Sequence, residues 1–325
     1  MMKPPVFTVG CPRSGSSYLY HLLLSAGGFA EFHTQMNVFD VLEPIYGDLS
    51  SRRVRKHMMK DWLQSKAFQV SGLDADQIEN RIVEECHSAG DFLRIVMAEV
   101  ARTQGVDRWV DSTPTNVPHM LRIKRDFPDA KFIHIIRDPR DAVLSLYKRG
   151  WVRPLPWDKN RSLLAGGVYW EWIVRKGRDF GRQLGTDYME TRYEDLVQTP
   201  AAELVKIGQF LECDLSYERI RANSVGSVKK PLTAFKEDLV EGHFNPVGRW
   251  KEKFPPQQLV QFEATVGSYM QELGYEPSTL ARNGSLGMKT THHIYIAFYS
   301  FKQWAKVNTP LSRMMVNYSD ILIDK

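Results

Sequence analysis

An arginine, three serines and a glycine stand together between an apolar run and a helical pattern near the start of the sequence. The run Val6–Gly10 predicts a buried strand, residues 11–17 read Cys-Pro-Arg-Ser-Gly-Ser-Ser, and apolar residues at helical spacing begin at Leu19. The first N–H groups of such a helix lack intrahelical partners, and the helix dipole favours an anion beside them. This strand, loop and helix therefore predict a phosphate-binding loop, hereafter the 11–17 loop.

The glycine spacing of the 11–17 loop also fits a nucleotide-binding P-loop. Four residues separate Gly10 from Gly15, but Ser16 stands where an ATPase needs lysine. Arg13 is then the cation of the loop. A plain connection between strand and helix is the alternative interpretation, because Gly, Ser and Pro are common in turns.

A second arginine and a hydroxyl follow the apolar run 131–136. Arg137 stands where this predicted strand ends, and Ser145 lies eight residues on, two turns along the following helix. An arginine fork with a hydroxyl can bind a second phosphate. The alternative for Arg137 is an ion pair with Asp138 or Asp141.

Tyr193 ends a third predicted strand, over residues 187–192. A tyrosine at the end of a strand can hold a nucleobase through its ring or its hydroxyl. The alternative is a half-buried tyrosine that only packs against its neighbours.

Strands and helices alternate along the chain. Further strands are predicted at 29–32 and 108–111, and helices are predicted at 52–66, 77–87, 91–103, 116–125, 161–184 and 200–211. Gly90 is expected to end the helix 77–87, and Asp91 to cap the helix 91–103. This rhythm predicts an α/β fold with a P-loop-like parallel sheet, helices on both faces and helical insertions. Ligands of such sheets bind at the carboxyl ends of the strands.

Composition narrows the class of protein. The chain has 325 residues, 43% hydrophobic and 25% charged, with a net charge of +5; this excess is too diffuse for a nucleic-acid binder but suits an anionic ligand. Cys11, Cys86 and Cys213 form no disulfide or metal-ligand pattern. With no signal peptide or transmembrane segment recognised, a cytoplasmic location is expected. One domain is predicted over 1–277, followed by a C-terminal extension over 278–325 that packs on the domain or on a partner.

Four segments in order resemble one family. The loop 10–17, the pair Arg137 and Ser145, the segment Tyr-Glu-Asp-Leu at 193–196 and the segment Gly-Arg-Trp-Lys at 248–251 resemble elements of the PAPS-dependent sulfotransferases. The resemblance runs over about residues 6–254. It implies the co-substrate PAPS (3′-phosphoadenosine 5′-phosphosulfate), no metal, and transfer of a sulfuryl group to an acceptor.

The resemblance also implies roles for individual residues. The 5′-phosphosulfate would be bound by Arg13, Ser14, Gly15, Ser16 and Ser17, and the 3′-phosphate by Arg137 and Ser145. The adenine would lie against Tyr18 and Tyr193. The segment with Arg249, Trp250 and Lys251 would lie near the nucleotide. Arg13 would in addition stabilise the charge that builds on the leaving oxygen. Electrostatic stabilisation suits arginine better than proton donation does.

The acceptor must lose a proton, and the resemblance places the base shortly after the first helix or at the end of the second long strand. His33 is the first candidate, because an imidazole can accept a proton near neutral pH. Glu31 is the second candidate and His119 the third. His134 lies inside a predicted core strand, where a structural role is expected.

Two segments depart from the family pattern. Ser112 stands where relatives carry lysine, so a contact to the transition state would come from elsewhere, with Lys124 and Arg140 as candidates. His-Phe-Asn at 243–245 stands where relatives carry Arg-Lys-Gly. The 3′-phosphate would then depend more on Arg137, or on Lys229 and Lys230.

The acceptor is not identified by the sequence. A small-molecule, carbohydrate or lipid-like acceptor is expected to bind among the loops 32–60, 85–92 and 148–165, with Trp151 and Trp157 in the last of these. A P-loop kinase or NTPase, and a non-catalytic nucleotide-binding or membrane-surface module, are the alternative functions. The aromatic segment 293–301 supports the second alternative, and a homodimer is left open.

Overall fold

Five parallel strands form the centre of the protein. The structure is a computed structural model that describes residues 2–235, 239, 245–279, 285–309, 311 and 314. Strands β1 (Val6–Gly10), β2 (Phe29–Ala30), β3 (Arg108–Asp111), β4 (Lys131–Ile136) and β5 (Tyr188–Arg192) lie in the order β2-β3-β1-β4-β5, and every pairing is parallel. The central position of β1 places the 11–17 loop at the middle of the carboxyl edge.

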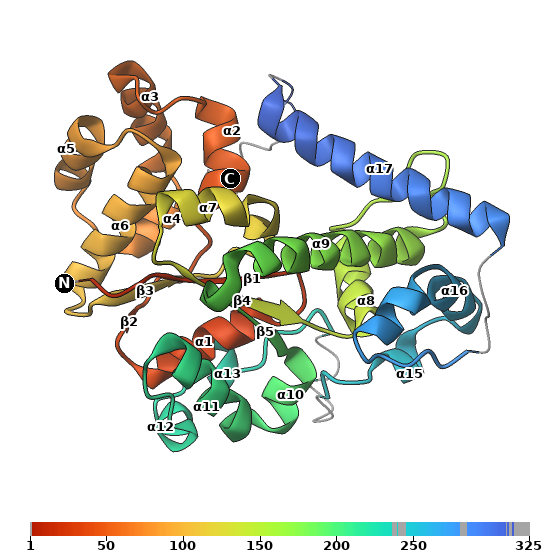
Figure 1. The fold of residues 1–325 in the computed structure, drawn as a ribbon. Helices are drawn as coiled ribbons and strands as arrows, with labels where there is room; N and C mark the ends of the chain where they lie inside the picture. Colours follow the sequence, from red (N-terminus) through yellow and green to blue (C-terminus); the bar gives the residue numbers. More distant parts are fainter. Residues whose placement is uncertain are drawn as a thin grey trace.

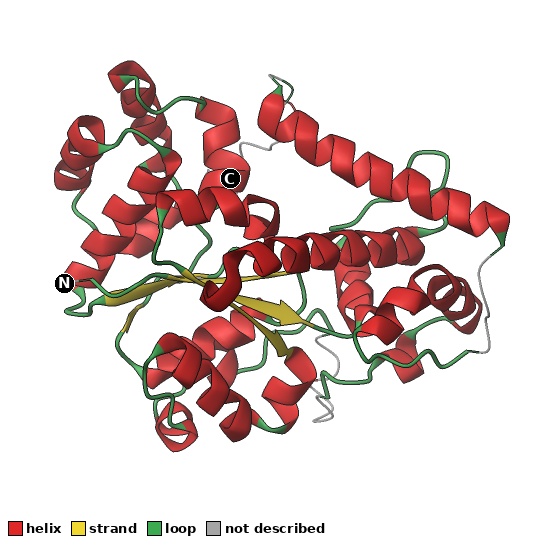
Figure 2. Ribbon diagram, viewed as in Figure 1, coloured by secondary structure: helices red, strands yellow, loops and turns green. Residues whose placement is uncertain are grey.

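Alternating strand residues build two cores, because successive side chains of a strand point to opposite faces. Val6 and Ile133 belong to one core, and Phe7 and Phe132 to the other. Helices therefore cover both faces, as Figures 1 and 2 show. The first face carries α1 (Ser16–Ala26), α10 (Tyr193–Gln198), α11 (Pro200–Leu211), α12 (Tyr217–Ala222) and α13 (Gly226–Lys229).

The second core is larger and holds the helical insertions. Its elements are η1 (Val38–Leu42), α2 (Glu43–Tyr46), α3 (Arg52–Trp62), α4 (Lys66–Ser71), α5 (Ala75–Glu85), α6 (Ala89–Thr103), η2 (Pro114–His119), α7 (Met120–Asp126), α8 (Pro139–Arg149), α9 (Ser162–Leu184), α15 (Trp250–Lys253), α16 (Pro256–Glu272) and α17 (Leu286–Asn308); the short η3 (Gly185–Asp187) leads into β5. The predicted α/β class with a P-loop-like parallel sheet and helices on both faces is confirmed.

The predicted boundary at Gly90 and Asp91 is wrong. The N-cap of α6 is Ser88, whose hydroxyl accepts a hydrogen bond from the Asp91 N–H at 3.0 Å, and Gly90 lies within the first turn. A Cβ on Gly90 would lie 2.5 Å from the Cβ of Asp126. The glycine therefore serves the close approach of α6 to the end of α7 and does not end a helix.

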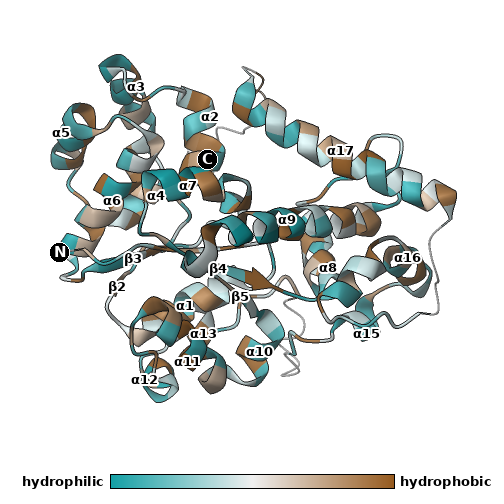
Figure 3. Ribbon diagram, viewed as in Figure 1, coloured by the Kyte–Doolittle hydropathy of each residue, from teal (hydrophilic) through white to brown (hydrophobic). Residues whose placement is uncertain are grey.

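The C-terminal segment that the structure describes is one long helix, α17, which lies beside α9 (Figure 1). Tyr295 and Tyr299 are buried against α9, and the Tyr299 hydroxyl donates to the carbonyl of Ala165 at 3.0 Å. Figure 3 shows hydrophobic and hydrophilic residues in turn along α17. The helix buries one side and exposes residues such as Phe301 and Trp304. The predicted extension thus contacts its own chain. No helix within the described ranges is long and apolar enough to cross a bilayer.

His134 is enclosed in the core. Its Nδ1 lies 2.7 Å from the Tyr188 hydroxyl, its Nε2 has no partner among the described residues, and a Cβ on Gly177 of α9 would lie 2.5 Å from its Cε1. Burial lowers the pKa of His134 to about 3. The ring is therefore held neutral.

We expect His134 to lower the stability of the folded state in mild acid. An imidazole of the unfolded chain binds a proton below about pH 6.5, whereas the folded state excludes that proton, so stability is lost as pH falls below this value. Urea denaturation measures the free energy of unfolding of the wild type and of His134→Gln. When the pH is lowered from about 7.5 to about 5, the free energy of unfolding of the wild type should fall by about 2 kcal/mol more than that of His134→Gln. The exposed His57→Gln should show no such change; an equal response of both variants would contradict the assignment.

Candidate active site

The 11–17 loop turns sharply between β1 and α1. Arg13 and Gly15 have positive φ angles of 72° and 101°. A Cβ on Gly15 would lie 2.2 Å from Cδ2 of Tyr193, and one on Gly10 would lie 2.5 Å from the carbonyl oxygen of Ile135. The two glycines therefore let the loop lie against β4 and against the tyrosine that follows β5.

Arg13 is held over the loop by two neighbours. Its Nε donates to Oγ of Ser145 at 2.9 Å, and its guanidinium lies 5.5 Å from the ring centre of Trp151. Burial, and then the charges of Arg149 and Arg137, lower the pKa of Arg13 to about 10. Arg13 stays charged at neutral pH and has no ion-pair partner among the described residues, so an anion beside it would be stabilised.

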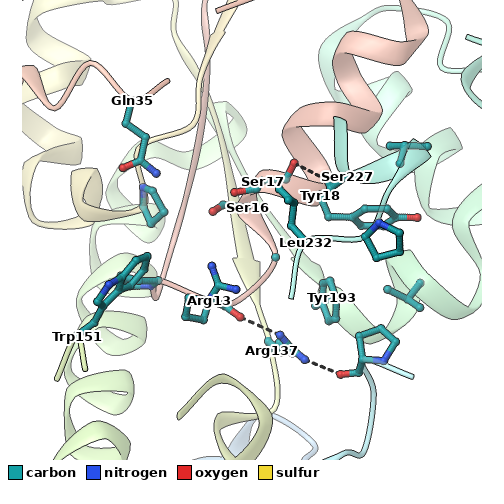
Figure 4. Close-up of a pocket in the computed structure, with 17 residues that line it drawn as sticks. Arg13, Ser16, Ser17, Tyr18, Gln35, Arg137, Trp151, Tyr193, Ser227 and Leu232 are labelled. Atoms are coloured by element: carbon teal, nitrogen blue, oxygen red, sulfur yellow. Dashed lines mark hydrogen bonds between the residues drawn. The ribbon is translucent and has the colours of Figure 1, made fainter. Parts of the chain in front are cut away.

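Arg137 joins the loop to two distant segments. Its Nη1 donates to the carbonyl of Arg13 at 2.9 Å, its Nη2 donates to the carbonyl of Pro246, and its guanidinium lies 4.4 Å from the ring centre of Tyr193. Figure 4 shows Arg137 between Arg13 and Tyr193. The guanidinium therefore points to the 11–17 loop.

The two aspartates after Arg137 pair with other groups. Asp138 binds Arg140, with 2.7 Å between Oδ2 and Nη2. Asp141 accepts hydrogen bonds from the N–H groups of Gly248 and Trp250 at 2.7 and 2.8 Å. The alternative interpretation, in which Arg137 forms an ion pair with Asp138 or Asp141, is thus not what the structure shows.

One cavity of about 350 Å³ lies along the 11–17 loop (Figure 4). Among the described residues, its walls hold two arginines and no carboxylate, and its volume lies in the range of ligand pockets. The lining residues are Pro12, Arg13, Gly15, Ser16, Ser17, Tyr18, Gln35, Pro114, Arg137, Trp151, Tyr193, Val197, Ser227, Val228, Pro231, Leu232 and Pro246. We call it the loop cavity.

A second cavity, of about 920 Å³, meets the loop cavity at Pro12 and Trp151, which line both. Its walls come from η1, η2, α8, α9, α17 and the segment 150–156. Most of the lining side chains are apolar or aromatic, with Asp40, Arg153, Lys302, Gln303 and Lys306 as polar members. We call it the aromatic cavity.

Comparison with known proteins agrees with this geometry. A model described as "Sulfotransferase family" matches residues 4–218, about two thirds of the chain. The chain belongs to the sulfotransferase family. The predicted resemblance to PAPS-dependent sulfotransferases and the predicted enzyme class are thereby confirmed, and the match disfavours the kinase or NTPase alternative.

Relatives of this sulfotransferase are distant. Protein-tyrosine sulfotransferase A of Caenorhabditis elegans is 22% identical over 282 residues, which cover 85% of this chain and 68% of that protein. The sulfotransferase domain from the curacin biosynthetic pathway matches with a TM-score of 0.57, 17% identity and coverage of 85% and 99% of the two chains. The sulfotransferase domain from the Synechococcus PCC 7002 olefin synthase matches with a TM-score of 0.53, 16% identity and coverage of 92% and 96%. The two structures share the fold.

The structure of this sulfotransferase brings together most of the predicted nucleotide residues. Seven line the loop cavity: Arg13, Gly15, Ser16, Ser17, Tyr18, Arg137 and Tyr193. Ser14 is buried within the loop, and Ser145 lies behind it as the partner of Arg13. Arg249, Trp250 and Lys251 lie outside the lining, on a segment tied to α8 through Asp141. Their roles stay predictions.

The candidate bases lie in three places. Nε2 of His33 lies 3.4 Å from Oε2 of Glu31, both side chains are about half exposed, and neither lines either cavity. Nε2 of His119 lies 3.4 Å from Asp40, beside the aromatic cavity. His134 is in the core, as expected of a structural residue.

The other candidate cations are engaged or lie outside the cavities. Lys124 binds Asp187 at 2.7 Å, and Arg140 binds Asp138 and Glu263. Lys229 and Lys230 lie outside the linings of both cavities, although their neighbours Ser227 and Pro231 line the loop cavity. The Ser112 hydroxyl lies 3.4 Å from the carbonyl of Ser16. Of the segment 243–245, residues 243 and 244 lie outside the described residues.

Sequence reasoning missed several lining residues. Gln35, Ser227 and Leu232 line the loop cavity, and α17 supplies one wall of the aromatic cavity. None stands in a motif, so only the tertiary structure reveals them. Among the predicted acceptor loops, 148–165 contributes Trp151 and its neighbours to the lining of the aromatic cavity, and 32–60 contributes Asp40. The loop 85–92 contributes no lining residue to this cavity, and Trp157 is 76% exposed.

We expect Gly15→Ala to destabilise the protein more than a matched glycine variant. Gly72 also has a positive φ, of 68°, but a Cβ there would meet nothing within 4 Å. Both variants incur the cost of the left-handed conformation, of about 1 kcal/mol, and only Gly15→Ala adds a collision with Tyr193, of roughly 1–3 kcal/mol. Urea denaturation measures the difference. Equal losses would show that the loop is not held against Tyr193.

Proposed function

We propose that this sulfotransferase transfers a sulfuryl group from PAPS to a hydroxyl or amine of an acceptor held in the aromatic cavity. The observation that carries the proposal is the meeting of Arg13 and Arg137 at a helix N-terminus, in a cavity whose described lining residues include no carboxylate. Such a site attracts a ligand with several negative charges. The location of the protein and a metal-free reaction remain predictions; in the described part of the chain, no group of three or more His, Cys, Asp or Glu side chains is placed to hold a metal ion.

The residues of the loop cavity fit the nucleotide. Oγ of Ser14 and Nε of Arg137 are buried with no hydrogen-bond partner in the described residues. Because buried polar atoms without partners are costly, these atoms are suited to a ligand with many acceptor oxygens. PAPS supplies such oxygens and the sulfuryl group that is transferred.

Each end of the nucleotide has its own set of groups. The 11–17 loop, with Arg13 and the hydroxyls of Ser14, Ser16 and Ser17, would hold the 5′-phosphosulfate. Arg137 would hold the 3′-phosphate, with Ser145, the hydrogen-bond partner of Arg13, as the second predicted group. The ring of Tyr193 would hold the adenine. Tyr18 meets Tyr193 edge to face, with ring centres 6.3 Å apart, and would complete the adenine wall.

Arg13 would stabilise the charge of the departing phosphate oxygen. It is preoriented by Ser145 and Trp151, so little reorganisation is needed when charge develops beside it. Its guanidinium keeps its proton, so the role is electrostatic. The acceptor would approach from the aromatic cavity, which reaches the loop at Pro12 and Trp151.

The base for the acceptor proton stays a prediction, with His33 as the first candidate and Glu31, 3.4 Å from it, as the second; both lie outside the linings of the two cavities. Asp40 faces the aromatic cavity, but hydrogen bonds and charges of His119 and Lys306 outweigh its burial and lower its pKa to about 2. A carboxylate with so low a pKa is a weak base. Asp40 is therefore better suited to holding the cavity wall than to proton transfer, and His119 stays the third candidate base.

We expect Arg137→Ala to weaken binding of PAP, the product nucleotide, by about 10- to 100-fold, the loss of one or two charge-assisted hydrogen bonds. Isothermal titration of PAP measures this, and Arg125→Ala, an exposed arginine on α7, serves as control. The wild type should bind PAP more tightly than ATP with Mg²⁺. Preference for ATP with Mg²⁺, or equal PAP affinity in Arg137→Ala, would overturn the nucleotide assignment.

We expect His33→Ala to lower kcat/KM by about 100-fold or more, the usual contribution of a general base. PAPS turnover with 2-naphthol as acceptor measures the loss, and PAP affinity should be unchanged. His87→Ala, another exposed histidine, is the control. Full activity in both His33→Ala and Glu31→Gln would remove this pair from the mechanism.

A further inference from the structure

Helix α17 supplies one wall of the aromatic cavity and lies beyond residues 4–218, the part matched by the family model. Its polar contacts include two with the opposite wall of the cavity, at η1 and η2. Nζ of Lys306 lies 2.7 Å from Oδ1 of Asp40, and Nε2 of Gln303 lies 3.4 Å from Nε2 of His119. The residues that hold this wall in place are therefore different from those predicted to bind the nucleotide.

The body of the aromatic cavity suits a flat or hydrocarbon group. Tyr169 stacks on Trp172 with ring centres 6.0 Å apart and meets Tyr299 of α17 edge to face at 5.3 Å. Trp151 and Phe298 add further aromatic surface. Such walls stabilise an apolar ligand through buried area and ring contacts.

The charges in this apolar lining are unbalanced. Among the described lining residues, the cations Arg153, Lys302 and Lys306 share one carboxylate, Asp40, which is already paired with Lys306. In the part of the chain that the structure describes, neither Arg153 nor Lys302 has an ion-pair partner. Burial and the neighbouring Lys306 also lower the pKa of Lys302. An anion at this wall would balance the unpaired positive charges and stabilise the charged form of Lys302.

We propose that the aromatic cavity selects acceptors that carry an anionic group, a carboxylate, sulfate or phosphate, on an aromatic or aliphatic body. Arg153 and Lys302 hold the anion at the rim, and the aromatic side chains hold the body. This inference rests on the proposed function, because it treats the aromatic cavity as the acceptor site. It adds the requirement that the acceptor carry a negative charge, which Lys302 of α17 would help to bind.

A matched pair of fluorescent probes tests the charge requirement. 1-Anilinonaphthalene-8-sulfonate carries a sulfonate on the same ring system as the neutral N-phenyl-1-naphthylamine. With saturating PAP, we expect the double variant Arg153→Met/Lys302→Met to bind the sulfonate at least 10-fold more weakly than the wild type does. Its affinity for the neutral probe should change by less than about twofold, because charge-assisted contacts alone are lost.

Two control variants distinguish the loss of charge from the loss of packing. Lys289→Met removes an exposed lysine of α17 outside the cavity and should leave both affinities unchanged, whereas Trp172→Ala should weaken both probes. Circular dichroism checks that the double variant folds. Unchanged sulfonate binding in the double variant, or an equal loss for both probes, would overturn the inference. Titration of PAP alone tests the nucleotide site, so failure there would be recognised as failure of the proposed function.

Discussion

The site depends on one buried guanidinium that has backbone carbonyls, and no carboxylate, as its hydrogen-bond partners. Arg137 ties the loop after β1 to the segment at Pro246 and lies on the ring of Tyr193. A carboxylate partner would cancel its charge, whereas carbonyl dipoles orient it and leave the charge in place. Three segments far apart in sequence are thus brought to one position, and the positive potential of that position is kept for a ligand.

The charged residues that follow Arg137 in the same short segment, in contrast, are paired with other groups of the protein. Arg140, three residues after Arg137, is held by Asp138 and Glu263 and lies 3.6 Å from the ring centre of Trp250. Asp141 binds backbone N–H groups of residues 248 and 250. These carboxylates are therefore engaged in structural contacts behind the cavity, which keeps negative charge out of its lining.

Local patterns were enough to predict the sheet and the main anion-binding residues. Strands β1 and β4 are mostly apolar, and the ends of parallel strands meet at one edge of the sheet, so Arg13, Arg137 and Tyr193 are expected together. The cap of α6 was mispredicted, because Gly90 reflects helix–helix contact and not local chain reversal. Gln35, Leu232 and the α17 wall were not predicted, because their positions depend on long-range packing that leaves no periodic signal.

The indole of Trp151 is the partition between two compartments. It lines both cavities, it lies over Arg13, and it is 58% exposed. The two cavities share this side chain and Pro12, so a change in the Trp151 rotamer would alter the lining of both. No described residue of α17 lines the loop cavity. A substitution in this helix can therefore reshape the aromatic cavity and leave the lining of the loop cavity intact.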